Sequence, residues 1–316
     1  MRYNRLGKTE LRVSAVSFGT APLGDMFGRA DEAQAVSSVH RALDAGVNFF
    51  DSSVYYGGGL AEQRLGAALR GRRDDVVVST KAGRFGPDDF DFSPRRIRES
   101  LHRSLELLQT DRVDLFHLHD IEFVELDGVF ADSYAELLRL RDEGKCRYVG
   151  MTGYPMEALI RAVSETDLDA VLSYAHYTLL NTRLADELAP VCDEHGVGLI
   201  NAAAVALGLL TPAGPRIDVR AGERIRRAAR RAAKVCEDRG ADIAFLANQF
   251  SIQRSGAATT VIGTTKAHHL DSAIAAESAP IDEELLAAVL DATEDVRTVS
   301  WSSGLPENNG DHTCSA

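Results

Sequence analysis

The chain has 316 residues, of which 45% are hydrophobic and 26% are charged, and its formal net charge is −12. This composition excludes a disordered chain, a collagen-like repeat and a disulfide-stapled miniprotein, and the negative charge argues against nucleic acid or an anionic membrane surface as a partner. No apolar run reaches the ~20 residues of a membrane-spanning helix. The four cysteines are widely separated and predict neither a zinc site nor a disulfide framework, so we expect a cytoplasmic protein.

Short aliphatic runs alternate with longer amphipathic runs along the chain. Nearly continuous apolar runs are typical of parallel strands that are covered by helices. Strands are predicted at 13–18, 48–51, 76–80, 113–117, 148–151, 170–174, 198–201 and 259–262.

Helix-period apolar positions, with capping residues such as Ser93 before Pro94, predict the elements between these strands. The predicted helices are 31–45, 60–70, 95–108, 132–143, 155–164, 183–194, 223–239, 241–253, 266–276 and 282–293. The repeated β then α order, with no linker-like shift in composition, predicts an α/β fold, a (β/α)8 TIM barrel in which residues 1–316 form a single domain. An N-terminal β-hairpin at 2–12, a long loop at 207–221 and an irregular C-terminal tail from Ser300 onward complete the expected chain.

Proton-active side chains fall where the predicted strands end, which is where barrels of this kind carry their chemistry. Asp51 ends the second strand, with Tyr56 five residues further on, and Lys81 directly follows the third. His117 and His119 lie at the end of the fourth strand and point to the same side of it. Lys81 is one of only five lysines, and a desolvated lysine needs a carboxylate partner, for which Asp51 on the neighbouring strand is the natural choice.

This combination predicts acid–base chemistry on an alcohol or carbonyl oxygen. A tyrosine hydroxyl has an ordinary pKa of about 10, which an adjacent ammonium lowers by stabilising the phenolate. We therefore expect Asp51 to hold Lys81 in place, Lys81 to lower the pKa of Tyr56, and Tyr56 to exchange the proton while His119 positions the oxygen. A nicotinamide cofactor would carry the electrons. A metal site built on His117 and His119 is the less favoured alternative, because no further ligand motif appears, and no metal is predicted.

A phosphate-binding site is expected after the last strand. The three glycines at 57–59 are followed by Glu62 where a Rossmann fingerprint needs its third glycine, so that fold is not indicated. The last strand instead runs into Gly263-Thr264-Thr265-Lys266 at the start of a helix, where backbone amides, two hydroxyls and an ammonium can hold phosphates. An ordinary helix cap explains this segment equally well when it is taken alone.

These residues together resemble the aldo-keto reductase family. The motifs that carry the resemblance are Phe18-Gly19-Thr20, residues 51–57, Glu62-x-x-Leu65-Gly66, Thr80-Lys81, and residues 114–119, 144–150 and 208–211. The resemblance implies a TIM barrel, a catalytic tetrad of Asp51, Tyr56, Lys81 and His119, and a nicotinamide dinucleotide bound without a Rossmann fold.

Within that family the chain is most similar to the sugar dehydrogenase branch, which contains L-galactose dehydrogenase and the aldose 1-dehydrogenases. Residues 18–24, 119–123, 172–177, 208–215 and 301–304 carry this similarity. It implies oxidation of the anomeric hydroxyl of a free aldose, similar to L-galactose, L-fucose or D-arabinose, to the lactone, with Tyr56 as the general base. The implied cofactor contacts are Gly19, Thr20, Thr152, Gly153, Tyr174, Leu207, Gly208, Leu210, Gly263, Thr264, Thr265, Lys266 and His269. The implied substrate contacts are Tyr56, His119, Asp120, Phe85, Phe123 and His176.

The chain departs from the broader family at several nicotinamide contacts. Thr152-Gly153 stands where many members have Ser-Asn, Tyr174 replaces a glutamine, and Ala202 replaces a stacking aromatic. Thr265 and His269 occupy positions where NADP-preferring members carry basic residues, so NAD is favoured over NADP.

Two alternative functions remain open at this point. One is a reductase or dehydrogenase for another carbonyl or alcohol, such as pyridoxal or a specialised metabolite, with specificity set by the loops at 85–92, 123–132 and 207–221. The other is a cofactor-sensing regulatory subunit with little turnover.

Overall fold

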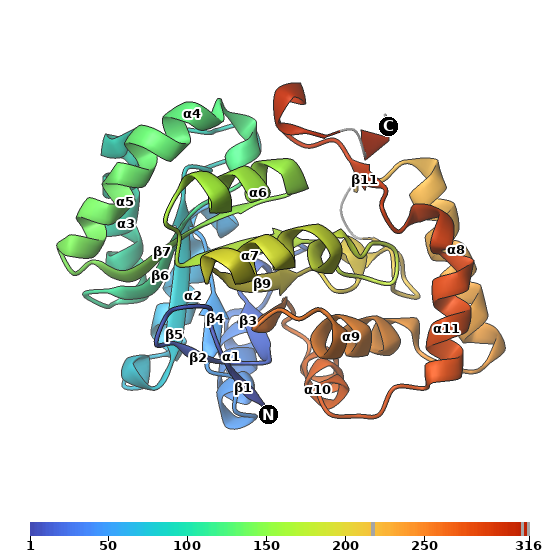
Figure 1. Cartoon of the computed structure of the whole chain (residues 1–316). Coiled ribbons are helices and arrows are strands. Elements are labelled where there is room, and N and C mark those ends of the chain that lie inside the picture. Colours follow the sequence, from blue (N-terminus) through green and yellow to red (C-terminus); the bar gives the residue numbers. More distant parts are fainter. Residues whose placement is uncertain (216–218, 311–312, 315–316) are drawn as a thin grey trace.

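The computed structural model describes residues 1–215, 219–310 and 313–314. In these residues eight parallel strands close into a barrel in the order β10, β3, β4, β5, β6, β7, β8, β9. Figure 1 shows strands of this barrel surrounded by helices. The barrel strands are β3 Val16–Gly19, β4 Phe49–Asp51, β5 Val77–Ala82, β6 Val113–Leu118, β7 Cys146–Gly153, β8 Ala170–Tyr174, β9 Gly198–Ala202 and β10 Thr259–Ile262. The predicted (β/α)8 barrel is confirmed.

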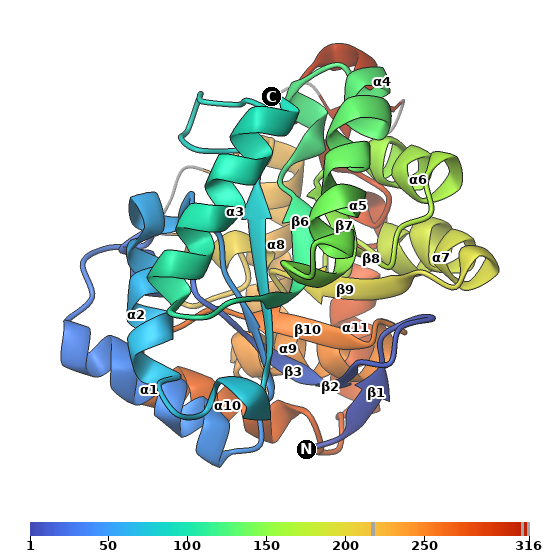
Figure 2. The same cartoon turned by 90° about the vertical axis from the view of Figure 1, so that its left-hand side faces the viewer.

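A ring of helices covers the outside of the barrel, and Figure 2 shows α2, α3 and α5 side by side in this ring. The ring consists of α1 Glu32–Asp44, α2 Leu60–Ala68, α3 Pro94–Leu108, α5 Tyr134–Asp142, α6 Met156–Glu165, α7 Ala189–His195, α9 Ile243–Arg254 and α10 Ala267–Ala276, with a short α4 at Leu126–Gly128. Side chains cap several of these helices as their sequences predict: Asp31 accepts from Gln34 N, and Ser93 accepts from Arg96 N. No helix in the described part of the chain combines the length and the apolar character that crossing a bilayer requires.

Two further helices depart from the expected alternation of one strand with one helix. Helix α8 (Glu223–Asp238) is inserted between β9 and α9, and α11 (Glu283–Ala292) follows α10. The two pack against each other outside the ring, at the right-hand edge of Figure 1. Their helical periodicity is visible in the sequence, but their place outside the ring depends on each burying its apolar face on the other.

The N-terminal hairpin pairs β1 (Tyr3–Arg5) with β2 (Arg12–Ser14) in antiparallel register. The strand predicted at 13–18 is therefore wrong as one element, because the chain leaves the hairpin at Ser14 and enters barrel strand β3 at Val16. Gly7 makes the hairpin turn with φ +52°, and a Cβ there would lie 2.3 Å from Gly198 N, so the close approach of the hairpin to the barrel requires glycine.

Alternate residues of each strand face the barrel interior and determine where polar groups gather. Phe49, Val77 and Leu115 form an apolar interior layer together with Leu6 and Leu11 of the hairpin, which closes the amino-terminal end of the barrel. Two and four residues further along the same strands, the interior positions become polar. This change places Asp51, Lys81, His117 of β6 and His119 just after β6 above the apolar layer, toward the carboxyl-terminal rim.

The C-terminal tail is more ordered than its sequence predicts. Strand β11 (Ser300–Trp301) pairs in parallel with β12 (Thr313–Cys314), and the Trp301 ring stacks on Tyr154 at 4.4 Å between centroids. Asn308 Nδ2 donates to the carbonyl oxygens of Glu122 and Val124. The tail, which the sequence predicts to be irregular, is thus held by long-range side-chain contacts. Such contacts leave no periodic pattern in the sequence.

Candidate active site

Backbone strain marks the carboxyl-terminal rim of the barrel. Asp120, Ala175 and Ala203 adopt positive φ angles of 55°, 61° and 59°, and each lies within two residues of the end of a barrel strand. Non-glycine residues reach this region only at a cost, and such strain gathers at functional sites. The rim is therefore the candidate location of the functional site.

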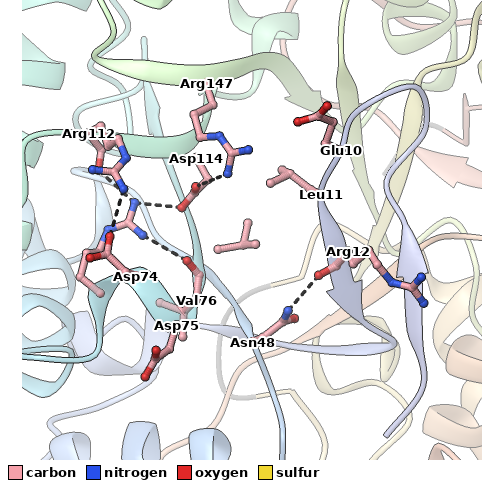
Figure 3. A pocket seen from close by; sticks show the side chains of 12 residues that line it. Glu10, Leu11, Arg12, Asn48, Asp74, Asp75, Val76, Arg112, Asp114 and Arg147 are labelled. Carbon is pink, nitrogen blue, oxygen red and sulfur yellow. Dashed lines mark hydrogen bonds and ion pairs between the residues drawn. The ribbon is translucent and has the colours of Figure 1, made fainter.

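The opposite end of the barrel carries a pocket of about 250 Å³, and five of the charged side chains that line it pair with one another (Figure 3). Asp114 accepts hydrogen bonds from Arg73 at 2.9 Å and from Arg147 at 3.2 Å, while Arg112 pairs with Asp74 at 3.0 Å. This network ties the amino-terminal ends of neighbouring strands together and is structural.

Lys81 is the centre of the cluster at the rim. Its Nζ donates to Asp51 Oδ2 and to the carbonyl oxygen of Ser52, both at 2.6 Å, and its side chain is 2% exposed. Ser79 Oγ donates to the other oxygen of Asp51 at 2.6 Å. Burial by itself lowers the pKa of Lys81, but the Asp51 carboxylate and Tyr56 outweigh burial and raise it, so Lys81 carries a positive charge at neutral pH.

Tyr56 lies over this charge, with its ring centroid 5.1 Å from Lys81 Nζ. A close approach of two glycines positions it: a Cβ on Gly24 would lie 2.5 Å from Tyr56 O, and one on Gly57 would lie 2.5 Å from Gly24 O. Burial raises the pKa of Tyr56 to about 12, although Lys81 acts to lower it. Lys81 does lower the pKa of Tyr56, as expected. The expected net decrease in this pKa is wrong, because desolvation of the phenolate raises the pKa by more than Lys81 lowers it.

His119 faces Tyr56 edge-on, with ring centroids 5.8 Å apart and an interplanar angle of 87°. Burial, followed by the charges of Lys81 and Arg84, holds the pKa of His119 well below its usual value, so the imidazole is neutral. Its Nδ1 lies 3.0 Å from Ser53 Oγ, which is also buried. A neutral imidazole beside a tyrosine hydroxyl can donate a hydrogen bond to a substrate oxygen without competing for its proton.

His117 lies on the same strand face, two residues below His119, and is fully buried. Neither of its ring nitrogens has a hydrogen-bond partner, and burial holds its pKa well below the usual value. Within residues 1–215 and 219–310, no group of three or more His, Cys, Asp or Glu side chains is arranged to hold a metal ion.

A charged and aromatic wall adjoins the tetrad. Arg84 donates to Asp120 Oδ2 at 2.6 Å and stacks over the Tyr55 ring at 4.4 Å, while Phe90 and Phe123 stack on each other at 4.1 Å. Asp120 and Phe123 are expected substrate contacts, whereas Arg84, Tyr55 and Phe90 are missing from that set. Arg84 lies three residues after Lys81, just beyond the end of β5, and this position is the signal that could have found it.

Two other expected substrate contacts are engaged elsewhere. Phe85 packs under the Arg96 guanidinium at 4.3 Å. His176 is fully buried, and its two ring nitrogens lie 3.1 Å from Ser173 Oγ and Ser300 Oγ. The structure therefore joins His176 to the C-terminal tail and does not bring it to the tetrad.

Glu122 is a buried carboxyl that the sequence does not single out. Its Oε1 accepts from Ser303 Oγ at 2.9 Å and from Tyr154 N at 3.3 Å, while its Oε2 has no partner. Burial, with a smaller contribution from the Asp120 carboxylate, raises the pKa of Glu122 to about 8. The neutral carboxylic acid thus anchors the tail beside the site.

We expect Glu122→Gln to remove a pH dependence of stability. In the unfolded chain Glu122 ionises near its ordinary value of 4.5, whereas in the folded chain it stays protonated to about 8. Because the folded state then binds the extra proton, the free energy of unfolding falls as the pH rises through this window. Urea unfolding at pH 5 to 8 should show the variant gaining stability relative to the wild type as the pH rises. A difference in unfolding free energy between variant and wild type that stays constant across this pH range would contradict the assigned protonation state of Glu122.

Several expected cofactor contacts line the same rim. Gly19 ends β3, and a Cβ there would lie 2.8 Å from Val261 Cγ1 and 3.6 Å from Gly263 Cα. The absence of a side chain at Gly19 therefore lets the end of β3 lie close to the end of β10. Thr20 is fully buried and donates to Ser52 Oγ at 2.8 Å.

Thr152 and Gly153, at the end of β7, lie against the residues that follow β6. Thr152 Oγ1 accepts from Asp120 N at 3.1 Å, and a Cβ on Gly153 would lie 2.9 Å from Glu122 Oε2. Tyr174 ends β8, and burial raises its pKa well above the usual value. Thr152 and Gly153 therefore support the turn at Asp120 that follows β6.

The loop after β9 contains Leu207, Gly208 and Leu210. Leu207 has φ 55°, and a Cβ on Gly208 would lie 2.9 Å from Pro215 Cα, while Leu210 is fully buried. Residues 216–218 of this predicted long loop lie outside the described residues.

The segment after β10 presents polar groups at the start of α10. Lys266 is the N-cap of α10 and makes no side-chain cap, and Thr264 Oγ1 accepts from its backbone N at 3.1 Å. Gly263 and His269 are exposed, and Thr265 is half-buried. The first-turn amides of a helix without a side-chain cap attract anions.

Comparisons with known proteins agree with this arrangement. The model of the Aldo/keto reductase family matches residues 15–294. The chain is 39% identical to an L-galactose dehydrogenase of Arabidopsis thaliana over 96% of this chain and 98% of that protein, and 33% identical to a D-threo-aldose 1-dehydrogenase of a Pseudomonas species over 81% and 87%. An aldo-keto reductase from Bacillus halodurans shares the fold with a TM-score of 0.77 at 24% identity, covering 98% of this chain and all of that one. The chain therefore belongs to the aldo-keto reductase family of oxidoreductases.

Proposed function

We propose that this enzyme oxidises the anomeric hydroxyl of a free aldose to the lactone, with a nicotinamide dinucleotide as the hydride acceptor. The observation that carries the proposal is the charged Lys81 held between Asp51 and Tyr56, with the neutral His119 facing Tyr56 across the rim. Relatives named as L-galactose dehydrogenase and aldose 1-dehydrogenases support the choice of substrate class.

The tetrad supplies proton transfer and orientation. The Tyr56 phenolate accepts the proton of the anomeric hydroxyl as the C–H bond breaks and the carbonyl of the lactone forms, while His119 donates a hydrogen bond to the same oxygen. Lys81 stabilises the phenolate, and Asp51 keeps Lys81 in place. A bound nicotinamide dinucleotide would supply the acceptor for the hydride, which carries both electrons.

This assignment predicts that aldose oxidation becomes faster as the pH rises above 7. The raised pKa of Tyr56, about 12, leaves the hydroxyl protonated at neutral pH, so the fraction of phenolate grows with pH. In that range the logarithm of kcat/KM for oxidation should rise with pH with a slope approaching one. The value of kcat/KM for carbonyl reduction should not rise with pH. Steady-state rates in both directions between pH 7 and 9 check this, and parallel profiles would contradict the assigned base.

The wall beside the tetrad supports a polyol substrate. The Asp120 carboxylate, neutralised by Arg84, can accept hydrogen bonds from sugar hydroxyls, and the stacked Phe90 and Phe123 rings offer an apolar face. A net negative chain also poses no barrier to a neutral sugar.

The segment from Gly263 to His269 suits the phosphates of the cofactor. The first turn of α10 contains no acidic residue and no side-chain cap, and Lys266, Thr264 and Thr265 lie beside it. These groups would hold a pyrophosphate or ribose through backbone amides, hydroxyls and one ammonium. Because Thr265 offers no charge to an additional ribose phosphate, we propose that NAD is preferred over NADP.

Thr265→Arg is expected to narrow this preference. A guanidinium at the start of α10 would pair with the additional phosphate of NADP and leave NAD contacts largely unchanged. Cofactor titrations should show that the wild type binds NAD more tightly than NADP. In the variant, the ratio of the dissociation constant for NADP to that for NAD should be smaller. An unchanged ratio would place the ribose phosphate away from Thr265.

A panel of substrates with NAD and NADP tests the proposal. Free aldoses should reduce the cofactor, and the corresponding methyl glycosides, in which the anomeric hydroxyl is blocked, should not. Turnover of pyridoxal or another carbonyl or alcohol without turnover of aldoses would favour a different dehydrogenase, and dinucleotide binding without any turnover would favour a regulatory subunit.

A further inference from the structure

Ser53 connects the loop that carries Tyr56 to the imidazole of His119. It is fully buried, and its Oγ lies 3.0 Å from His119 Nδ1 and 3.2 Å from the backbone nitrogen of Tyr55. Neither the sequence motifs nor the tetrad assigns a role to this hydroxyl.

The direction of these two hydrogen bonds follows from the number of donors. The backbone N–H of Tyr55 can only donate, so the Ser53 oxygen accepts there and keeps its own proton for the second partner. If His119 Nδ1 instead carried the proton, it would donate to an oxygen whose own hydrogen then has no acceptor, which is unfavourable in a buried site.

The surroundings of the other ring nitrogen favour the same arrangement. His119 Nε2 lies 3.7 Å from Asp120 Oδ2, beyond hydrogen-bond distance but close enough for the carboxylate to attract a proton on Nε2. In residues 1–215 and 219–310, the side-chain hydrogen bond of His119 is the one at Nδ1, which leaves Nε2 available to a ligand.

We propose that Ser53 is a positioning residue that fixes the neutral Nε2–H tautomer of His119. By donating to Nδ1 it directs the only imidazole proton to Nε2, where it can meet the anomeric oxygen of the substrate. The inference about catalysis rests on the proposed function, whereas the tautomer itself is a property of the resting protein. In the reaction the Nε2 proton stays on His119, and the hydroxyl proton goes to Tyr56.

NMR of the protein with ¹⁵N-labelled histidine tests the tautomer directly. The wild type should show His119 with a protonated Nε2 and an unprotonated Nδ1, and Ser53→Ala should move the population toward Nδ1–H. A wild type with a protonated Nδ1, or a Ser53→Ala spectrum identical to the wild type, would overturn the proposal. Because this readout needs no substrate, it stands even if aldoses prove not to be turned over.

Kinetics then test the consequence for catalysis. Ser53→Ala should lower kcat for aldose oxidation about 10- to 100-fold with unchanged NAD affinity, as expected for loss of a group that orients a reacting side chain. Ser53→Thr, which keeps the hydroxyl, should recover most of the rate. Ser17→Ala is the matched control, because Ser17 is also fully buried and hydrogen-bonded but pairs with Thr259 in the barrel wall. An equal loss in Ser17→Ala and Ser53→Ala would reduce Ser53 to a structural role and overturn the proposal.

Discussion

Replacing Tyr56 with phenylalanine should lower kcat for aldose oxidation by about 10²- to 10⁴-fold, the usual contribution of a general base. The ring that faces His119 at 5.8 Å and covers Lys81 at 5.1 Å remains, so only the group that accepts the proton is lost. Cofactor affinity should be unchanged, because no cofactor contact is assigned to the phenolic oxygen.

The measurement pairs steady-state oxidation rates with fluorescence titration of the dinucleotide. Tyr148→Phe is a suitable control, because Tyr148 also uses its hydroxyl in a hydrogen bond, accepting from Glu10 N at 3.1 Å, but it does so beside the N-terminal hairpin. A Tyr56→Phe variant that keeps wild-type kcat would remove Tyr56 from the chemistry, whereas lost cofactor binding would show that the substitution disturbs the rim.

Lys81→Met is expected to affect stability and catalysis together. Asp51 and Lys81 form a pair in which both side chains are almost completely buried, so removing the ammonium leaves an uncompensated carboxylate. Breaking such a pair costs about 3–5 kcal/mol of unfolding free energy. Loss of the same charge raises the pKa of Tyr56 further, because Lys81 is the group that lowers it, so oxidation at a fixed pH slows.

The double variant Asp51→Asn/Lys81→Met separates these two effects. It removes both charges, so most of the lost stability should return, while oxidation stays slow and its pH profile stays displaced upward. Urea unfolding and kcat/KM between pH 7 and 9 check both parts. Full recovery of activity in the double variant would mean that Lys81 acts only through stability.

The barrel, and the gathering of Asp51, Tyr56, Lys81 and His119 at one rim, could be predicted because both follow from local patterns. The alternation of apolar runs with helix-period segments determines the strand order, and the period of two along a strand places Asp51 and Lys81 on the interior face. The β then α order brings the ends of neighbouring strands to one rim, where Tyr56 and His119 also lie.

Contacts between distant segments could not be predicted in the same way. The pairing of Arg84 with Asp120 joins loops 36 residues apart in sequence, and the anchoring of His176 by Ser300 joins residues 124 apart. The sign of the change in the Tyr56 pKa depended on how completely the barrel buries the ring, which no local pattern reports. The role of Ser53 has no local signal for a similar reason, because it depends on the position of His119.

The most direct test of the proposed oxidation uses a free aldose that carries deuterium at the anomeric carbon. The enzyme is incubated with this sugar and NAD, and the reduced cofactor and the sugar product are analysed by mass spectrometry. Oxidation at the anomeric carbon predicts one deuterium in the reduced nicotinamide and a lactone that contains none. Reduced cofactor without deuterium, or a product that keeps the label at the anomeric carbon, would contradict it.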